Sequence, residues 1–218
     1  IPLNLRPFCD WQCSLERIDT EVGYIIDNVV LIAMEFQTST QWSWRKVMSL
    51  KEHAWAVGKD VYNEHVPNET ICVHDHAWTT RMLDFKRLLG SARRSAERRA
   101  NRGRVGAGIC SLSVADLVGL YATQRGRCAY SGISFSSQGS QDWKMSLERH
   151  DNTRGYTKEN SSLICREFQT ADYTSFATEA HSVQDSPQWS VKKFSRLQHW
   201  LEIPQIRSWI ESQARTVV

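Results

Sequence analysis

Residues 10–38 of the chain, here termed copy one, recur without a gap as residues 142–170, termed copy two, and 16 of the 29 paired positions are identical. A repeat of this length indicates that one structural module is present twice in the 218 residues. The shared positions read D-W-x-x-S-L-E-R-x-D, then G-Y, then N, and finally L-I-x-x-E-F-Q-T. Because most of these shared residues are polar, we expect the pattern to describe a site as well as a fold.

The correspondence extends beyond the two copies. Residues 41–50 match residues 188–197 at an offset of 147 in place of 132, so the second half holds 15 additional residues near 171–187. Upstream, Ile1 pairs with Ile133, which is preceded by the segment QRGRCAYSG. We therefore expect the sequence to be a fragment of a longer repeat protein, in preference to one whose first copy is naturally truncated.

The composition favours a globular protein of the cell interior. With 41% hydrophobic residues and nine Trp, the chain can fill compact cores. No run approaches the roughly 18 apolar residues of a membrane span, and the first residues do not resemble a signal peptide. The six Cys are scattered and do not form a dense disulfide framework. We expect an intracellular protein with no membrane partner, while its compartment and oligomeric state stay open.

Positive charge is concentrated in one segment. The formal net charge is +3, but residues 84–127 alone hold ten Lys or Arg against three acidic residues. Six arginines fall within twelve residues of a stretch whose Ala and Glu favour a helix: Arg93, Arg94, Arg98, Arg99, Arg102 and Arg104. Helical spacing places several of them on neighbouring turns, as a stripe that suits a phosphate backbone. The alternative is a solvated helix face. The density of Arg without Lys favours nucleic acid, with DNA preferred over RNA.

Hydrophobic periodicity and capping residues predict an α+β chain of repeated strand–loop–strand–helix units. Strands are expected near residues 11–17 and 29–32 and at the matching positions of copy two. Helices are expected over residues 41–66, 77–101, 113–126 and 190–200, the first with Ser43 as N-cap and the third with a capping box at Ser113 and Asp116. The predicted domains are residues 1–66, a linker over 67–83, and residues 84–218 with the basic helix.

Copy two and its surroundings follow a fixed order: a turn-like CAYSG, a strand ending in Glu-Arg-His-Asp, a Gly-containing loop, Asn160, an apolar strand and a helix start. This order resembles the HNH family of His-Me finger, or ββα-metal, nucleases, and is most similar to HNH proteins of phages and large viruses. Their skeletons read like SLERxD, GYTxxN and EFN. The resemblance covers about residues 84–200 and 1–50. It implies an α+β fold of two ββα-metal modules joined by helices, in which a hairpin and a helix hold one divalent metal ion.

The resemblance also assigns roles in copy two. Glu148 falls where the family has a metal-binding Asp, and Arg149 falls where most members have the His that activates water. Asn160 matches the Asn that braces the hairpin loop, and Gln169 matches the helix-borne Asn or His that completes the metal site. Two of these four residues therefore differ from the usual ones. The corresponding residues of a degenerate copy one are Glu16, Arg17, Asn28 and Gln37.

Phosphodiester hydrolysis needs a cation to stabilise the developing charge and a base to deprotonate water. A carboxylate and a carboxamide can hold a largely hydrated Mg²⁺ or similar ion. Arg149 is too basic to take a proton and is better suited to clamping phosphate. His150 has the right chemistry, but consecutive strand residues point to opposite faces, so it can act only if the strand end bulges or twists. Copy one has Ile18 there and no evident base.

Several recurring residues also have a purely structural interpretation. Glu148, Arg149 and Asp151 could form an internal ion-pair network, with Asn160 capping backbone groups. The four tryptophans at matched positions are expected in module cores: Trp11, Trp42, Trp143 and Trp189.

Metal binding through cysteine has weaker support. Only Cys128 and Cys165 remain of the two CxxC pairs that carry zinc in related proteins, so the sequence does not favour structural zinc. The run Cys72-Val-His74-Asp75-His76 is a second metal candidate, against a polar linker.

The sequence thus predicts a nucleic-acid-binding HNH-like protein that acts as a metal-dependent endonuclease on DNA. One alternative is a catalytically inactive HNH fold that serves as a structural subunit of a ribonucleoprotein, such as an organellar ribosome, or of a chromatin assembly. Another is an interaction scaffold without nucleic acid.

Overall fold

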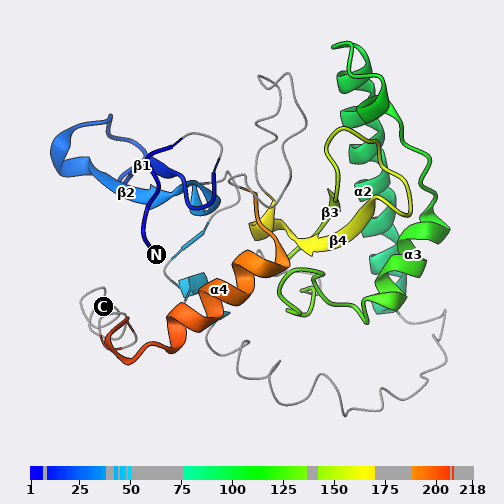
Figure 1. The fold of residues 1–218 in the computed structure, drawn as a ribbon. Coiled ribbons are helices and arrows are strands. Elements are labelled where there is room, and N and C mark those ends of the chain that lie inside the picture. Colours follow the sequence, from blue (N-terminus) through cyan, green and yellow to red (C-terminus); the bar gives the residue numbers. More distant parts are fainter. Residues whose placement is uncertain are drawn as a thin grey trace. The chain divides into compact units, whose positions relative to one another are not determined.

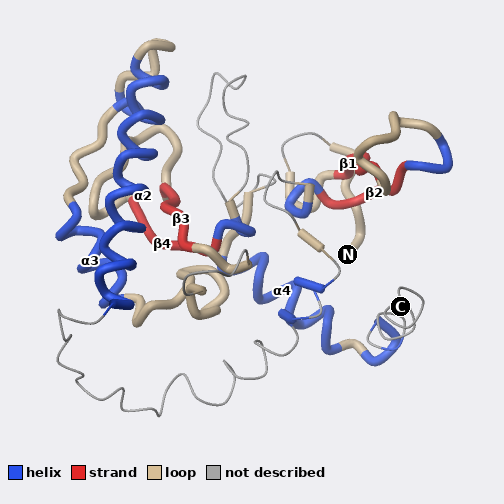
Figure 2. The backbone as a smooth tube through the Cα atoms, turned by 180° about the vertical axis from the view of Figure 1, so that it is seen from behind, coloured by secondary structure: helices blue, strands red, loops and turns tan. Residues whose placement is uncertain are grey.

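A computed structural model describes residues 1–6, 9–37, 42–43, 45–47, 49–50, 76–136, 142–169, 188–206 and 208 of the chain. Helices and small antiparallel sheets are both present, which confirms the α+β class (Figures 1 and 2). The strands are β1 (Cys13–Arg17), β2 (Val29–Ala33), β3 (Met145–Arg149) and β4 (Ser161–Cys165). The helices with described bounds are α2 (His76–Ala100), α3 (Val114–Thr123) and α4 (Val191–Glu202).

The two copies form the same hairpin. In the β1–β2 hairpin, Cys13 lies opposite Ala33 and Arg17 opposite Val29. The β3–β4 hairpin has the corresponding register, with Met145 opposite Cys165 and Arg149 opposite Ser161. A 3-10 turn follows each hairpin, at Met34–Phe36 and at Arg166–Phe168. The residue-for-residue register shows that the sequence repeat is a repeat of structure.

The chain divides into two compact units that do not follow the order of the copies. Unit 1 comprises Ile1–Glu52, Glu167–Ala171 and His181–Val218, and unit 2 comprises His53–Arg166 and Asp172–Ala180. The β3–β4 hairpin therefore belongs to unit 2, whereas the 3-10 turn after it leads into unit 1.

In unit 2, helices α2 and α3 pack on the β3–β4 hairpin (Figure 1). The α2 residues Phe85, Leu89, Ala92 and Ala96 recur at helical spacing, and all are buried. Helix α3 begins with the predicted capping box, in which Ser113 and Asp116 bond reciprocally. These helices cover the hairpin so well that every residue of β4 is buried.

Unit 1 has an aromatic core. Phe36, Trp42, Phe168 and Trp189 pack with ring centroids 5.1–5.5 Å apart, and Trp11 joins them 5.8 Å from Trp189. Trp11 and Trp189 are 7% and 1% exposed, and Trp143 in unit 2 is 9% exposed. Three of the four recurring tryptophans are therefore buried as predicted, and Trp42 is half-buried.

The predicted helices agree with the observed ones except near the linker. Helix α2 begins at His76, inside the segment predicted as a linker over residues 67–83. Residues 45–47 and 49–50 are helical, and the Lys46 amide donates to the Ser43 hydroxyl, as expected for an N-cap. The rest of the helix predicted to residue 66 lies outside the described residues.

Candidate functional site

The matched asparagines brace the hairpin loops in both copies. The Asn160 side chain accepts from the Asp151 amide at 2.9 Å and donates to the Asp151 and Gly155 carbonyls at 3.0 and 2.8 Å. Asn28 makes the corresponding bonds, accepting from the Asp19 amide at 2.8 Å and donating to the Asp19 and Gly23 carbonyls at 3.0 Å. Both asparagines thus tie together the two ends of their own hairpin loop, with the same set of hydrogen bonds in each copy.

Arg149 is engaged with its own loop. Its Nη1 donates to the Asn152 and Arg154 carbonyl oxygens at 2.9 and 2.8 Å, and the residue is 3% exposed. Arg17 does the same in copy one, where Nη1 donates to the Thr20 and Val22 carbonyls at 2.6 and 3.3 Å. Each guanidinium also lies over the tyrosine of its loop, at 5.4 Å from the Tyr156 centroid and 5.3 Å from that of Tyr24. These contacts favour the structural interpretation of Arg149 over phosphate clamping.

The two residues assigned to the metal in copy two lie in different units. Glu148, 9% exposed on β3, lies in unit 2, and Gln169, half-buried, lies in unit 1. In copy one, Glu16 is half-buried. The Gln37 amide donates to the Leu15 carbonyl and its oxygen accepts from the Ser14 hydroxyl, so Gln37 ties the end of the hairpin to β1.

His150 is exposed at the end of β3, while its backbone amide donates to the Asn160 carbonyl at 3.0 Å. The next residue, Asp151, accepts from the amide and hydroxyl of Thr153 at 2.8 and 2.6 Å. Hydrogen bonding from Thr153 lowers the pKa of Asp151 below its ordinary value. The His150 side chain is therefore accessible to solvent, whereas Asp151 is a turn-forming carboxylate.

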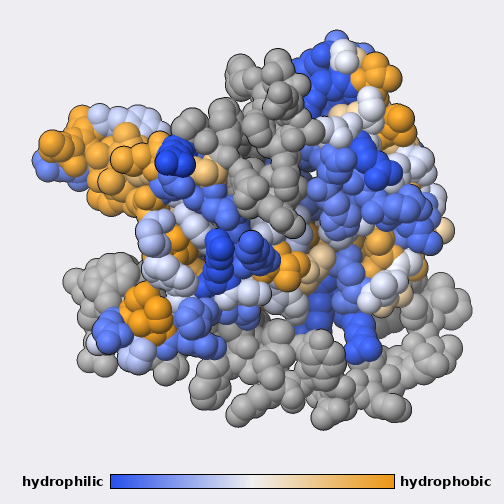
Figure 3. Space-filling view, in the orientation of Figure 1, coloured by the Kyte–Doolittle hydropathy of each residue, from blue (hydrophilic) through white to orange (hydrophobic). Residues whose placement is uncertain are grey.

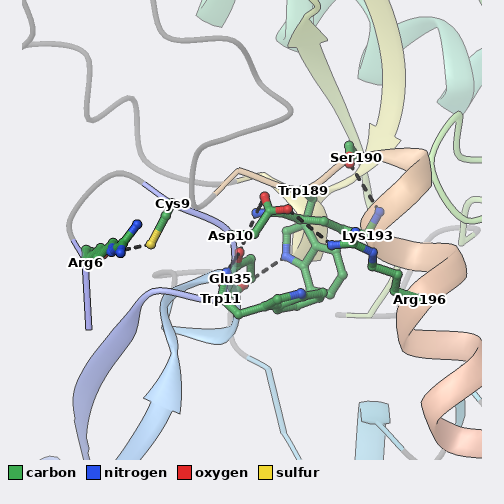
Figure 4. A network of polar contacts seen from close by, with 9 residues as sticks. All are labelled: Arg6, Cys9, Asp10, Trp11, Glu35, Trp189, Ser190, Lys193 and Arg196. Atoms are coloured by element: carbon green, nitrogen blue, oxygen red, sulfur yellow. Dashed lines mark hydrogen bonds and ion pairs between the residues drawn. The ribbon is translucent and has the colours of Figure 1, made fainter. Parts of the chain in front are cut away.

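Two buried ion pairs connect the halves of the chain in unit 1. Lys193 of α4 contacts Glu35 of copy one, and Lys46 lies 2.7 Å from Glu167 at the end of copy two (Figure 4 shows the first pair). All four side chains are at most 5% exposed. Since the sequence repeat matches Lys46 with Lys193 and Glu35 with Glu167, each lysine pairs with the glutamate of the other half. The helical residues that follow each hairpin are thus exchanged between the halves.

Further bonds fix the Glu35 end of this arrangement. The Glu35 carboxylate accepts from the Trp11 amide at 2.8 Å, and the Trp189 indole donates to the Glu35 carbonyl at 2.8 Å (Figure 4). Asp10 lies 3.1 Å from the Lys193 ammonium. Burial raises the pKa of Glu35 and outweighs the attraction of Lys193, which acts in the opposite direction.

The sequence analysis did not predict these ion pairs, although the Glu and the Lys that form them both recur between the halves of the chain. The signal was present in the identical Glu of E-F-Q-T and the identical Lys of Q-W-S-x-x-K. Their separations of 158 and 121 residues along the chain gave no local indication that they meet.

The arginines of the basic segment fall into two groups. Arg93, Arg94, Arg98 and Arg102 are exposed, whereas Arg99 and Arg104 are half-buried. Arg99 lies over the Tyr156 ring at 5.4 Å, and Arg104 donates to the Asn152 carbonyl at 3.4 Å. The predicted stripe thus leaves four guanidinium groups facing solvent, and the other two help to hold the β3–β4 loop.

Metal ligands do not cluster in the part of the chain that the structure describes, where no group of three or more His, Cys, Asp or Glu could hold an ion. Cys128 and Cys165 are buried and form no disulfide, and the Cys165 amide donates to the Cys128 sulfur at 3.2 Å. Burial opposes ionisation of Cys128, but hydrogen bonds from Cys165 and Ser131 lower its pKa to about 7. Of the second metal candidate, residues 72–75 lie outside the described residues.

No protein-family model, curated protein or solved structure matches the chain. Among the described helices, none is long and apolar enough to cross a membrane.

Proposed function

We propose that the protein binds nucleic acid through the exposed arginines of α2 and the turn after it, on a scaffold of two HNH-like modules. The observation that carries this proposal is the solvent-facing group Arg93, Arg94, Arg98 and Arg102. Guanidinium groups bind phosphate oxygens with charge-assisted hydrogen bonds, and each phosphate contact releases counterions. The excess of seven positive charges in residues 84–127 adds a field that attracts polyanions.

The scaffold role rests on what the repeated residues do in the described structure. The matched Asn and Arg side chains satisfy loop carbonyls, and the matched Glu and Lys side chains pair inside unit 1. Residues engaged in this way hold a fold together and leave little side-chain chemistry for a substrate. They support the inactive HNH-like structural subunit as the leading function, with DNA preferred over RNA as the ligand.

A metal-dependent endonuclease in copy two is the second candidate, and the exposure of His150 favours it. In this proposal His150 activates water, and Glu148 contributes to holding Mg²⁺ or a similar divalent ion. Copy one, with Ile18 in place of the histidine, would be inactive. The cation would stabilise charge on the scissile phosphate.

Binding measured against salt tests the first candidate. A labelled DNA duplex and an RNA duplex of equal length are titrated with the wild-type chain and with Arg94→Ala/Arg98→Ala. We expect the double variant to bind more weakly and to reduce the slope of log K against log salt by about 2, close to one unit for each lost phosphate contact. Arg6→Ala/Arg196→Ala removes the same charge elsewhere and is expected to change the slope less. A flat salt dependence of the wild type would contradict nucleic-acid binding.

Plasmid nicking with Mg²⁺ or Mn²⁺ separates the two candidates. Cleavage by the wild type that is lost in both Glu148→Ala and His150→Ala would establish the endonuclease. Salt-dependent binding without cleavage above these variants would leave the non-catalytic binding protein.

A further inference from the structure

The β1–β2 hairpin exposes an apolar surface. Leu15, Tyr24 and Leu31, here termed the copy-one face, are 46%, 64% and 63% exposed. Leu15 on β1 and Leu31 on β2 lie opposite each other in the hairpin. Together with Tyr24 and Leu5, they line an open groove of about 590 Å³. Figure 3 shows hydrophobic residues gathered over this hairpin. An apolar patch of this kind on a folded domain indicates an interaction surface.

In copy two, the matching residues are covered by helices of the same chain. The corresponding residues Leu147, Tyr156 and Leu163 are identical in type and are 4%, 6% and 0% exposed. Helices α2 and α3 cover them: α2 contacts β3, and α3 contacts β4. The difference in burial therefore comes from the covering helices, because the hairpins share sequence at these positions and share their register.

The cover of copy two also makes two polar contacts that define its chemistry. Gln124, the C-cap of α3, accepts from the Leu163 amide at 2.9 Å and donates to the Leu163 carbonyl at 2.7 Å. Arg99 of α2 lies over Tyr156 in addition to Arg149. A complete cover thus combines apolar side chains, a carboxamide for the strand edge and a guanidinium for the tyrosine.

We propose that the copy-one face is the docking surface for an arginine-bearing helix pair of a partner polypeptide. The partner places apolar side chains on Leu15 and Leu31, a carboxamide on the backbone of Leu31, and a guanidinium on Tyr24. Lipid lacks the carboxamide, and nucleic acid lacks the cation. The α2–α3 pair of a second copy of this chain is already engaged on its own β3–β4 hairpin. The proposal is independent of nucleic-acid binding, which uses other residues.

A peptide of residues 76–126, which carries the natural cover of copy two, is the probe. It is labelled and titrated with the 218-residue chain near physiological salt, with binding followed by fluorescence anisotropy. We expect saturable binding that Leu31→Asp weakens by about tenfold or more, because a charge replaces a buried leucine contact. Arg99→Ala and Gln124→Ala in the peptide are expected to weaken binding as well.

Matched controls separate docking from charge and from general stickiness. Val105→Asp in the chain changes an apolar residue that is 73% exposed in unit 2 and is expected to leave the affinity unchanged. Arg93→Ala in the peptide removes an arginine that is exposed in unit 2 and is also expected to be neutral. Leu31→Asp alters an exposed residue, and its circular dichroism spectrum should match the wild type.

Three results would overturn the proposal: absence of saturable binding to the wild type, binding that Leu31→Asp does not weaken, or a dimer of the free chain that Leu31→Asp abolishes. The last result, seen by sedimentation, would show that a second copy covers the face. Loss of nucleic-acid binding in Arg94→Ala/Arg98→Ala leaves this test unaffected, so the two proposals can fail separately.

Discussion

The hairpins of copy one and copy two keep the same register and the same loop braces, yet Leu31 is 63% exposed where its counterpart Leu163 is fully buried. The identical residues therefore do two different things. The polar ones specify the internal geometry of a hairpin and its loop, wherever it stands. The apolar ones become core only where other elements cover them, as α2 and α3 do in unit 2.

In unit 1, by contrast, the two halves of the chain contribute equivalent residues to the buried ion pairs. Lys46 and Lys193 are both buried and each neutralises the glutamate of the other half. The halves are thus alike in their exchanged ion pairs and unlike in the cover of their hairpins.

Removing the buried lysines should have the largest effect and should test whether the exchange is reciprocal. We expect Lys193→Met and Lys46→Met each to cost about 3–5 kcal/mol, because each leaves a buried carboxylate without its cation. The control Arg196→Ala, which breaks the more exposed pair with Asp10, should cost no more than about 1 kcal/mol. The free energy of unfolding from urea titrations measures all three. If either lysine variant lost less unfolding free energy than Arg196→Ala, the two ion pairs would not be equivalent.

Truncating the matched leucines tests the difference in cover. Leu163→Ala should cost about 2–5 kcal/mol, because it leaves a cavity among α3, β3 and β4. Leu31→Ala should stay within about 0.5 kcal/mol, since its side chain is largely solvated. Equal losses in urea unfolding would show that the copy-one face is covered in solution.

The matched loop glycines sharpen the same comparison. A Cβ at Gly155 would fall on the Ile109 carbonyl oxygen and 2.8 Å from its carbon, whereas a Cβ at Gly23 would meet nothing within 4 Å. We expect Gly155→Ala to cost about 1–3 kcal/mol, because the segment at Ile109 would have to move. Gly23→Ala should lie within about 0.5 kcal/mol of the wild type. Thermal unfolding measures both, and an equal loss in the two variants would contradict the assigned packing.

The pH dependence of stability should show the smallest effect. Burial raises the pKa of Glu35 above its ordinary 4.5, so the folded state holds this proton more tightly than the unfolded state. The resulting stability is complete below pH 4.5 and is lost as the pH rises through the raised pKa. In Glu35→Gln, the free energy of unfolding should therefore decrease less as the pH rises above 4.5. Urea titrations at several pH values measure this change.

Asp151 is a control, because its contribution to stability changes with pH in the opposite direction to that of Glu35. Its hydrogen bonds with Thr153 lower its pKa below 3.8, so its contribution is present above that pH and is lost on further acidification. Asp151→Asn should leave the change above pH 4.5 intact. If Asp151→Asn, and not Glu35→Gln, reduced the loss of unfolding free energy above pH 4.5, the assignment of that loss to Glu35 would be contradicted.

The sequence predicted most of the local structure and little of what surrounds it. Periodicity and caps predicted α2 and α3 closely, because those signals are local. The repeat predicted two equivalent hairpins. The exchanged ion pairs and the unequal cover could not be predicted in the same way. They depend on contacts between residues far apart in the chain, and Leu31 and Leu163 are the same letter in the same pattern.

The candidate site shows the same division. The Asn160 brace was expected from the resemblance to the HNH family. The residue type of Arg149 suggested phosphate, whereas its bonds to two loop carbonyls became apparent only with the structure. The arginines of the basic segment are equivalent in sequence, but only the structure separates the exposed Arg94 from Arg99 over Tyr156.

Residue-resolved hydrogen exchange most directly tests the central claim, that one hairpin is built twice and covered once. The Leu163 amide donates to Gln124 beneath α3, so it should exchange only when unit 2 opens. We predict that the Leu31 amide exchanges at least about tenfold faster, because Leu31 is 63% exposed where Leu163 is fully buried. Equal protection of Leu31 and Leu163 in the isolated chain would contradict the account.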